Sequence, residues 1–414
     1  MRIVLFEDDK VAQLFPLTLM RPAYTIRCGS QALIDWALEW GACVRGQVRP
    51  YLADWQLAHC PSFCGQTEGR DRTLLVNSRV APTSQNFRQL TALTNQSEDG
   101  ILTHEGRLVA AVLPADIDFS SASFETTQQQ QTFLNLEKIS QLPALRQPLQ
   151  LIDYPHQIVQ CHLESIQDHL NHRIASGQLR EVRDGVFVGD SELNDFVATD
   201  TSQGPIVIEN QVKIRPFTCL NGPIYLDSFS CLGEHTVLKN GVAIGRYAKV
   251  GGEISASVIE SYSNKSHYGY LGHSYVGQWV NLGAGTSNSN LKNSYGQIRM
   301  EVDNEPINTR MQFMGCVIGD FTKSAINTSI FTGKLIGACS MLYGYVTTNV
   351  PSYANYARSF GQITDLNPEI VALTQKRAFQ RRGLQQQEWQ RALLKTAYNL
   401  VACDRQLADQ PLSL

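Results

Sequence analysis

Residues 206–250 read IVIENQVKIRPFTCLNGPIYLDSFSCLGEHTVLKNGVAIGRYAKV, and apolar residues recur in this stretch with a period of six. A period of six fits neither an α-helix nor a simple strand, but it is typical of a hexapeptide-repeat parallel β-helix. One register contains Ile208, Ile214, Leu220, Leu226, Leu232, Leu238, Ile244 and Val250. A second register, two residues earlier, contains Ile206, Val212, Thr218, Ile224, Ser230, Thr236, Val242, Ala248 and Ile254.

The same step returns further along the chain after an interruption. An inward residue of a β-helix stacks on the equivalent residues of the coils above and below, in a core closed to water, so it must be aliphatic or small. With about eighteen residues per coil, the segment 185–350 should hold roughly eight or nine coils. The proline in NVP, 349–351, ends the repeat because proline cannot donate to a strand ladder. The later positions are Ile318, Ser324, Ile330, Ile336 and Leu342.

The segment before the repeat has a different pattern, in which short apolar runs alternate with helical periodicity. Strands are predicted at 3–6, 73–76 and 108–113, and a helix at 32–40. Such alternation favours an open, mostly parallel α/β sheet. The glutamine-rich stretch 127–131 is interpreted as a solvated helix or loop.

The segment after the repeat carries a long helical pattern over 368–402, which should pack against the repeat or a neighbouring subunit. Its basic cluster KRAFQRR, 376–382, is interpreted as a solvated helix face. The sequence therefore predicts three parts: an α/β domain at 1–182, the β-helix at 183–350 and a C-terminal helical tail at 351–414.

The composition excludes several classes of protein. Only 18% of the 414 residues are charged and the net charge is −3, which argues against general binding of nucleic acids or membrane surfaces. No apolar run is long enough to span a bilayer, and the N-terminus does not look like a signal peptide. The ten cysteines lack paired spacing, which favours free thiols. We therefore expect a cytoplasmic protein with no nucleic-acid or membrane partner.

Residues 264–296, NKSHYGYLGHSYVGQWVNLGAGTSNSNLKNSYG, combine a loop-like composition with apolar residues at the coil positions Val276, Val280 and Leu282. The polar residues between them should point outward. Because the flat faces of β-helices commonly assemble side by side, these residues would line a groove between subunits that suits an elongated acyl-CoA.

The residue types in this stretch suit acyl transfer to an amine. His267 can take a proton from an attacking amine at neutral pH. Backbone amides of 283–285 could stabilise the thioester oxyanion. Amide side chains suit the hydroxyl groups of a sugar, and lysines suit a phosphate. These candidate binding residues are Asn281, Asn290, Lys265 and Lys292.

A second histidine cluster has a simpler interpretation. His162, His169 and His172 share one face of a predicted helix, which could attract a metal ion. No cysteine or carboxylate completes a ligand set, so a solvated helix is the favoured interpretation.

The repeats together with SHYGYLGHSYVGQWVNLGAGTSNSN resemble the acetyltransferase half of bifunctional UDP-N-acetylglucosamine pyrophosphorylase/glucosamine-1-phosphate N-acetyltransferases. That family has a histidine, then Tyr-Leu-Gly three residues on, then Asn-Leu/Ile-Gly-Ala-Gly-Thr and another Asn. The resemblance implies a left-handed β-helix, a homotrimer and a role in nucleotide-sugar biosynthesis for the cell envelope. It also implies that His267 is the catalytic base. Binding of the acceptor or of acetyl-CoA falls to Tyr270, Asn281, Asn290, Gly283, Ala284 and Gly285.

One departure from the family concerns the acceptor phosphate, which an upstream Arg and Lys hold in the family. The region 233–252 offers Lys239 and Lys249 without a clean alignment. The acceptor would then be a different amino sugar, or Lys265 or Lys292 would hold its phosphate.

The segment FPLTLMRPAYTIRCGSQALIDWAL, 15–38, resembles sugar nucleotidyltransferases. Their Gly-rich phosphate loop is replaced here by Glu7-Asp8-Asp9, and Asn77 and Ser78 stand where the metal-binding Asp is expected. Two interpretations follow. Either Arg21, Arg27 and Arg79 bind the phosphates of UTP or another NTP, with Mg²⁺ at Asp8 or Asp9, or the domain has lost catalysis and serves as a module.

Together these patterns predict an acetyl-CoA-dependent N-acetyltransferase that acts on an amino-sugar phosphate and is fused to a nucleotidyltransferase-like domain. Two alternatives remain: a sugar nucleotidyltransferase whose β-helix only oligomerises or regulates, and a non-catalytic scaffold that binds sugar nucleotides.

Overall fold

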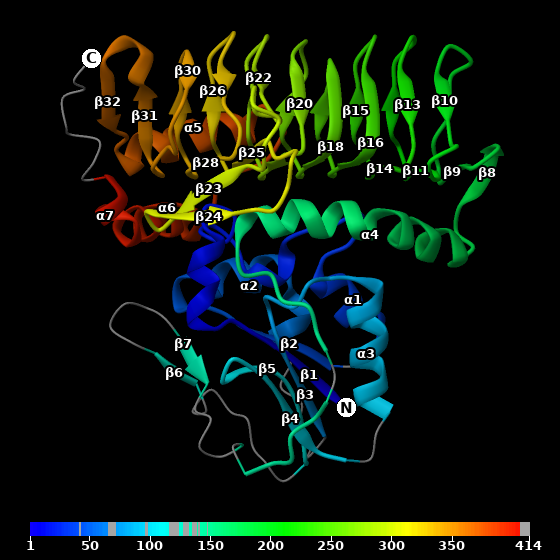
Figure 1. Ribbon diagram of the computed structural model, residues 1–414, viewed down its shortest axis with the longest axis vertical. Coiled ribbons are helices and arrows are strands. Elements are labelled where there is room, and N and C mark those ends of the chain that lie inside the picture. The colour runs from blue at the N-terminus through cyan, green and yellow to red at the C-terminus, as the bar shows by residue number, and fades with distance from the viewer. Residues whose placement is uncertain are drawn as a thin grey trace.

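The chain folds into a long β-solenoid, an α/β domain beneath it and a group of C-terminal helices at one end (Figure 1). This computed structural model describes residues 1–40, 43–64, 72–95, 98–115, 124–126, 132–134, 139, 141–146 and 148–405. The glutamine-rich stretch 127–131 lies outside the described residues. The predicted fold class, an α/β domain with a left-handed parallel β-helix and a helical tail, is confirmed.

The N-terminal sheet has the strand order β2-β1-β3-β5-β4. Strand β1 runs parallel to β2 and β3, whereas β5 is antiparallel to both β3 and β4. The antiparallel edge arises because β4 and β5 are joined by the tight turn Glu105-Gly106, both with positive φ, and such a turn reverses the chain. The strands are β1 (Arg2–Phe6), β2 (Cys43–Gln47), β3 (Thr73–Asn77), β4 (Gly100–His104) and β5 (Arg107–Leu113).

The three predicted N-terminal strands and the predicted helix are present, the latter as α1 (Leu33–Glu39). Two further helices flank the sheet, α2 (Ala53–His59) and α3 (Ser84–Asn95). A small hairpin of β6 (Phe124–Thr126) and β7 (Thr132–Leu134) stands apart from the main sheet.

The solenoid has three faces of parallel strands. Its first face faces the N-terminal domain, and along it Ile206 pairs with Ile224 and Ile224 with Val242, one coil further each time. The strands of this face are β9 (Val186–Val188), β11 (Ile206–Ile208), β14 (Ile224–Leu226), β16 (Val237–Ile244), β18 (Glu253–Ile259), β21 (Tyr275–Val276), β25 (Cys316–Ile318) and β28 (Lys334–Ile336). The short β8 (Arg180–Arg183) adds an antiparallel edge.

The other two faces meet at the edge farthest from the N-terminal domain. The second face contains β12 (Lys213–Ile214), β15 (Cys231–Leu232), β17 (Lys249–Val250), β19 (Asn264–Lys265), β26 (Lys323–Ser324), β29 (Met341–Leu342), β31 (Ala354–Ala357) and β32 (Gln362–Asp365). The third contains β10 (Ala198–Asp200), β13 (Cys219–Asn221), the first halves of β16 and β18, β20 (Tyr270–Gly272), β22 (Ser287–Asn288), β27 (Ser329–Ile330) and β30 (Tyr345–Val346).

The residues of the six-residue registers point into the solenoid, as predicted. All of them are buried except Ile214, which is partly buried. Val276, Val280 and Leu282 are also buried, so the glycine- and asparagine-rich stretch continues the coil. Stacking of these side chains forms one continuous apolar core along the solenoid.

The interruption of the repeat is an insertion between β22 and β25. It contains the hairpin of β23 (Arg299–Val302) and β24 (Glu305–Asn308). Its residues Ile298, Met300 and Met314 are buried in a cluster with residues of helix α4. The insertion thus adds an apolar contact without breaking the stack, because Asn281 pairs directly with Lys323 on the second face.

Helix α4 (Pro155–Ala175) runs along the first face and separates the solenoid from the N-terminal sheet (Figure 1). Ile158 and Ile166 share a core with Val207 and Val258, which point outward from the solenoid. The prediction of a solvated helix is wrong for this segment: His162 and His169 are fully buried because the helix is covered on two sides. His172 alone is half-exposed and contacts Glu39.

The C-terminal helices pack on the solenoid of the same chain, which was one of the two predicted alternatives. Phe379 of α5 (Pro368–Gln380) lies 4.5 Å from Trp279, ring centre to ring centre. The hydroxyl of Tyr353 donates to the carbonyl of Leu394 in α6 (Glu388–Leu400) at 2.7 Å. The short α7 (Ala402–Arg405) follows.

Two expectations from composition can be compared with the described residues. Among them, no helix is both long enough and apolar enough to cross a membrane. Among the described cysteines, eight have free thiols, namely Cys28, Cys43, Cys161, Cys219, Cys231, Cys316, Cys339 and Cys403, and four of these eight are buried.

Candidate functional site

His267 lies at the solenoid corner that joins the second and third faces, between the end of β19 and the start of β20. Its side chain is exposed, and no residue in the described part of the chain hydrogen-bonds its imidazole. Its carbonyl oxygen, in contrast, accepts from the Nζ of Lys265 at 3.1 Å. The imidazole is therefore open to a ligand, while the hydrogen bond from Lys265 fixes the backbone of His267.

Glycines make room for this corner in the preceding coil. A Cβ atom on Gly251 would lie 2.4 Å from the carbonyl oxygen of Ser266, and Gly252 has a φ of +75°. Because real Cβ contacts are never so close, Gly251 allows the two coils to approach at this point.

Tyr270 and Asn290 are brought together on the third face. The Nδ2 of Asn290 donates to the Tyr270 hydroxyl at 2.9 Å and lies 2.8 Å from the Nδ1 of His273. Burial lowers the pKa of His273 to about 4, and its ring stacks on Phe313, so it is a neutral acceptor. Burial also raises the pKa of Tyr270. The network holds Tyr270 beside the corner as a neutral hydroxyl.

Asn281 lies on the other side of the corner, on the second face. Its Oδ1 accepts from the Nδ2 of Asn264 at 3.4 Å, and the Oδ1 of Asn264 accepts from Arg382 at 2.9 Å. The structure therefore does not bring Asn281 and Asn290 together within one chain. The two asparagines flank the His267 corner from opposite faces.

The two lysines predicted to hold a phosphate are placed differently from each other. Lys265 is 2% exposed, and its Nζ donates to the carbonyl oxygens of Gly251 and His267 at 3.0 and 3.1 Å. Lys292 lies at the surface in the insertion, where its Nζ donates to the carbonyl of Gln297 at 2.9 Å. Of the two, only Lys292 could reach a phosphate without rearrangement of the coil.

The Gly283-Ala284-Gly285 segment follows His267 by one coil. Two of its amides are already used: the N–H of Gly283 donates to the Ser324 hydroxyl and that of Gly285 to the Tyr268 carbonyl, both at 3.0 Å. These two amides are therefore not available to an oxyanion in this geometry. A role of the segment in acetyl-CoA binding stays a prediction.

The structure adds Glu253 to the surroundings of the site and pairs it with Lys239, one of the two upstream lysines considered for the acceptor phosphate. Glu253 is the register partner of Tyr270 in the preceding coil, and its carboxylate pairs with Lys239 at 2.7 Å. Glu253 and Tyr270 occupy the same ladder position in successive coils, but they are seventeen residues apart. A search for a strict period of six, with eighteen residues per coil, therefore does not align them.

The acidic residues at the end of β1 have partners within the chain. Glu7 is buried and accepts from the backbone of Ala23 and from Arg49, whose Nε lies 2.9 Å from its Oε2. Glu7 therefore organises the following loop instead of facing a phosphate.

The residues predicted to bind Mg²⁺ do not fit that ion. Both oxygens of Asp8 accept from Arg79, at 2.8 and 2.7 Å, and Asn77 also donates to one of them. Asp9 pairs with Arg107. No group of three or more potential metal ligands occurs within the described residues. A cation would have to displace two arginines from these carboxylates.

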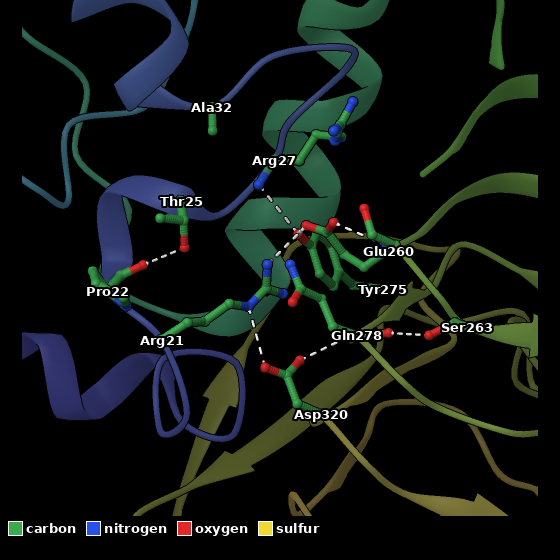
Figure 2. Close-up of polar contacts among 12 residues, drawn as sticks. Arg21, Pro22, Thr25, Arg27, Ala32, Glu260, Ser263, Tyr275, Gln278 and Asp320 are labelled. Atoms are coloured by element: carbon green, nitrogen blue, oxygen red, sulfur yellow. Dashed lines mark hydrogen bonds and ion pairs between the residues drawn. The ribbon is translucent and has the colours of Figure 1, made fainter. Parts of the chain in front are cut away.

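The loop predicted to bind a nucleotide docks on the solenoid instead, as Figure 2 shows. Arg21 is fully buried and pairs with Glu260 at 3.0 Å and with Asp320 at 3.3 Å. Arg27 pairs with Asp227 at 3.0 Å, and its backbone N–H donates to the Tyr275 hydroxyl. The guanidinium groups of Arg21, Arg27 and Arg79 are thus all paired with carboxylates of this chain, and phosphate binding by them stays an untested prediction.

The titration of this interdomain cluster follows from its burial. Burial alone would lower the pKa of Arg21, but the carboxylates of Asp320 and Glu260 outweigh it and raise the pKa. Burial raises the pKa of Asp320 to about 6, against the opposing effect of Arg21. Glu260 is also opposed by burial, yet Arg21 and Arg27 lower its pKa. At neutral pH the cluster is therefore a buried set of ion pairs that joins the N-terminal domain to the solenoid.

Comparison with known proteins gives a family match to the N-terminal domain and partial similarity to curated relatives. The family described as "Sugar nucleotidyl transferase" matches residues 3–175. The chain is 30% identical over 149 residues to the "Bifunctional sugar-1-phosphate nucleotidylyltransferase/acetyltransferase" of Sulfurisphaera tokodaii, covering 36% of this chain and 37% of that relative. It is 32% identical over 151 residues to the "Bifunctional protein GlmU" of Thermotoga petrophila, covering 36% and 30%.

The resemblance predicted from the motifs is confirmed by these matches. The chain spans about a third of the length of these curated relatives. Among solved structures it is similar to a UDP-N-acetylglucosamine acyltransferase of Francisella novicida, with 15% identity, a TM-score of 0.27 and coverage of 55% of this chain and 70% of that one. A likeness of this size does not support a functional assignment.

Proposed function

We propose that the solenoid corner around His267 catalyses the transfer of an acetyl group from acetyl-CoA to the amine of an amino-sugar phosphate resembling glucosamine 1-phosphate. The observation that carries this proposal is the exposed His267 imidazole, free of partners in the described chain, on a backbone held from below. It stands at the motif position of the catalytic base in the family that the chain resembles.

In this reaction the amine nitrogen attacks the thioester carbonyl carbon while His267 accepts a proton from the amine. The C–N bond forms, the C–S bond breaks, and the sulfur of coenzyme A leaves and takes the proton from the imidazolium. Tyr270 and Asn290 offer neutral hydrogen-bonding groups to a sugar hydroxyl on one side of the base. Lys292 offers a charge for the acceptor phosphate.

The proposal also includes a homotrimer. Large apolar side chains are exposed around the corner: Tyr268 at 66%, Ile326 at 68% and Tyr345 at 62%. In a side-by-side assembly, these residues would be covered by a second copy, and Asn281 of one chain could reach the ligand bound at Tyr270 and Asn290 of another. A cytoplasmic location and a role in nucleotide-sugar biosynthesis for the cell envelope belong to the same proposal.

The experiment is acetyl-CoA turnover by the full chain against a panel of amino-sugar phosphates, monitored as thiol release. Replacing His267 with Ala should lower kcat by about 10²- to 10⁴-fold without changing the oligomeric state. His104→Ala makes the same substitution at an exposed histidine of strand β4, far from the solenoid corner, and is the matched control, which should keep wild-type turnover. Retained turnover in the His267 variant would refute the proposal.

The family match of residues 3–175 favours a second candidate function, sugar-1-phosphate nucleotidyl transfer by the N-terminal domain. Pyrophosphate release from a sugar 1-phosphate and UTP or another NTP would establish it. Pyrophosphate release without thiol release would support a β-helix that only oligomerises or regulates. Ligand binding without either product would support a non-catalytic scaffold.

A further inference from the structure

Lys265 occupies a position that faces the solenoid core. It pairs in register with Val250, which itself pairs with Leu232, and Leu232 with Ile214. In the coil that follows, the residue next to Asn281 is Leu282, which is buried. Four neighbouring coils thus place an aliphatic side chain where this coil places a lysine.

The ammonium group of Lys265 has backbone partners only. Its Nζ donates to Gly251 O at 3.0 Å and to His267 O at 3.1 Å, and it has no carboxylate partner in the described part of the chain. Burial lowers its pKa to about 8. Burying an ammonium without a counter-charge costs free energy that an aliphatic residue would not, so the lysine weakens the core at this position.

The two carbonyls that Lys265 contacts belong to adjacent coils. Gly251 is also a point of close approach between the two coils, since a Cβ there would lie 2.4 Å from Ser266 O. One glycine earlier in the same register, Gly233, has no contact closer than 3.6 Å. The lysine and Gly251 together therefore fix the backbone from Ser266 to His267 against the preceding coil.

We infer that Lys265 is a positioning residue for His267: its ammonium ties the His267 carbonyl to the preceding coil and so sets the direction in which the imidazole projects. This inference rests on the proposed function of His267 as the base. It replaces the prediction from sequence that Lys265 holds a phosphate, because the side chain points into the core.

The test compares Lys265→Met with Lys213→Met in the full chain. Methionine keeps the length of the stem in a position that other coils fill with aliphatic residues, so the fold should persist. We expect kcat for acetyl transfer to fall by about 10- to 100-fold in Lys265→Met, with KM for both substrates within about twofold of wild type. Lys213→Met makes the same change at an exposed lysine of the second face and should match wild type. An unchanged kcat in Lys265→Met would overturn the inference, as would a loss confined to KM, which would indicate phosphate binding.

A second pair of variants covers the case in which Lys265→Met does not fold. Gly251→Ala pushes on the Ser266 carbonyl and leaves the lysine side chain itself unchanged, whereas Gly233→Ala introduces only an ordinary contact. Gly251→Ala should lower kcat at unchanged KM and Gly233→Ala should not. Equal kcat values for the two variants would overturn the inference.

A readout without activity separates this inference from the proposed function. In protein labelled with carbonyl-¹³C histidine, the His267 signal should move in Lys265→Met and stay in Lys213→Met, because only the former loses the hydrogen bond to that carbonyl. If the wild-type protein shows no acetyl transfer, the proposed function fails on its own. An unmoved His267 signal would overturn the contact itself.

Discussion

The loop of the N-terminal domain and the His267 corner of the solenoid are both rich in polar residues, yet the chain uses them in opposite ways. In the loop, Arg21 and Arg27 reach across to carboxylates of the solenoid. At the corner, no described residue hydrogen-bonds the imidazole of His267.

This difference distinguishes polar groups that stabilise the fold from polar groups that are open to a ligand. A buried charge is costly unless other groups of the chain pair with it or hydrogen-bond to it. Once it has such partners, it contributes to the stability of the fold and is not available to a ligand. A polar group that is exposed on a rigid backbone keeps its hydrogen-bonding capacity for a ligand. Four variants or conditions test that distinction, in order of decreasing effect.

The largest effect is expected from Arg21→Met. Glu260 and Asp320 would then lose the guanidinium that pairs with both of them, which should lower the free energy of unfolding by about 3–5 kcal/mol. Chemical denaturation measures this loss. The triple variant that also carries Glu260→Gln and Asp320→Asn is the control and should recover part of it. A loss below about 1 kcal/mol would show that the cluster does not hold the domains together.

Acidification should destabilise the protein through helix α4. Burial lowers the pKa of His162 to about 4, so between pH 6.5 and 4 the unfolded chain binds a proton that the folded chain does not. Stability is therefore complete above pH 6.5 and falls as the pH drops towards 4, by about 3 kcal/mol for this one group.

Asp320 acts with the opposite sign, since its raised pKa of about 6 stabilises the folded chain as it takes up a proton. For this reason the comparison should be made between variants. Glutamine at position 162 keeps a donor for Gly241 O and an acceptor for Gly29 N. His162→Gln should therefore reduce the number of protons taken up on unfolding between pH 6.5 and 4 by up to one, and so flatten the plot of unfolding free energy against pH. His172→Gln, at a half-exposed position of the same helix, should follow the wild-type curve.

A smaller effect is expected from Tyr270→Phe at the corner. The change removes the hydroxyl that accepts from Asn290, and the loss of one such hydrogen bond should cost about 1 kcal/mol of unfolding free energy. If the hydroxyl also contacts the acceptor, KM for the acceptor should rise by about fivefold, which steady-state kinetics will measure. A variant with unchanged KM would remove Tyr270 from the binding site.

The smallest effect is expected from Lys239→Met. Its ion pair with Glu253 lies at the surface, with both side chains more than a third exposed, so its loss should change the free energy of unfolding by less than about 1 kcal/mol. Thermal unfolding at low and high salt is a sufficient measurement. A larger loss would mean that polar residues near the corner are structural after all, like those of the loop.

Part of the site could be predicted from sequence because each coil of the solenoid requires aliphatic or small residues at regularly spaced inward positions. The inward positions from Ile206 to Val250 follow six-residue steps, and each coil there spans eighteen residues, as the pairing of Ile224 with Val242 shows. The next coil spans only fifteen, because Val242 pairs with Ser257 and Val250 with Lys265. Extrapolation of the eighteen-residue coil beyond Val250 therefore loses phase, and the period alone does not mark Lys265 as an inward position.

Other features carry no local signal. The partners of Arg21 lie 239 and 299 residues away in the chain, at Glu260 and Asp320. The burial of His162 depends on a solenoid face that begins after the helix has ended. A sequence pattern reports which face of an element is apolar, but not what covers the other face.

Spacing along the chain is enough to predict the repeat, three of the five strands of the N-terminal sheet and the position of His267 within a motif. Which charged residues are available to a ligand depends, in contrast, on how distant parts of the chain pack together. The physical reason is that a charge is stabilised by whatever group lies within a few ångströms in space. For Arg21 and Asp8 that group belongs to a residue far along the chain and for Lys265 to the preceding coil, whereas no described residue hydrogen-bonds the imidazole of His267.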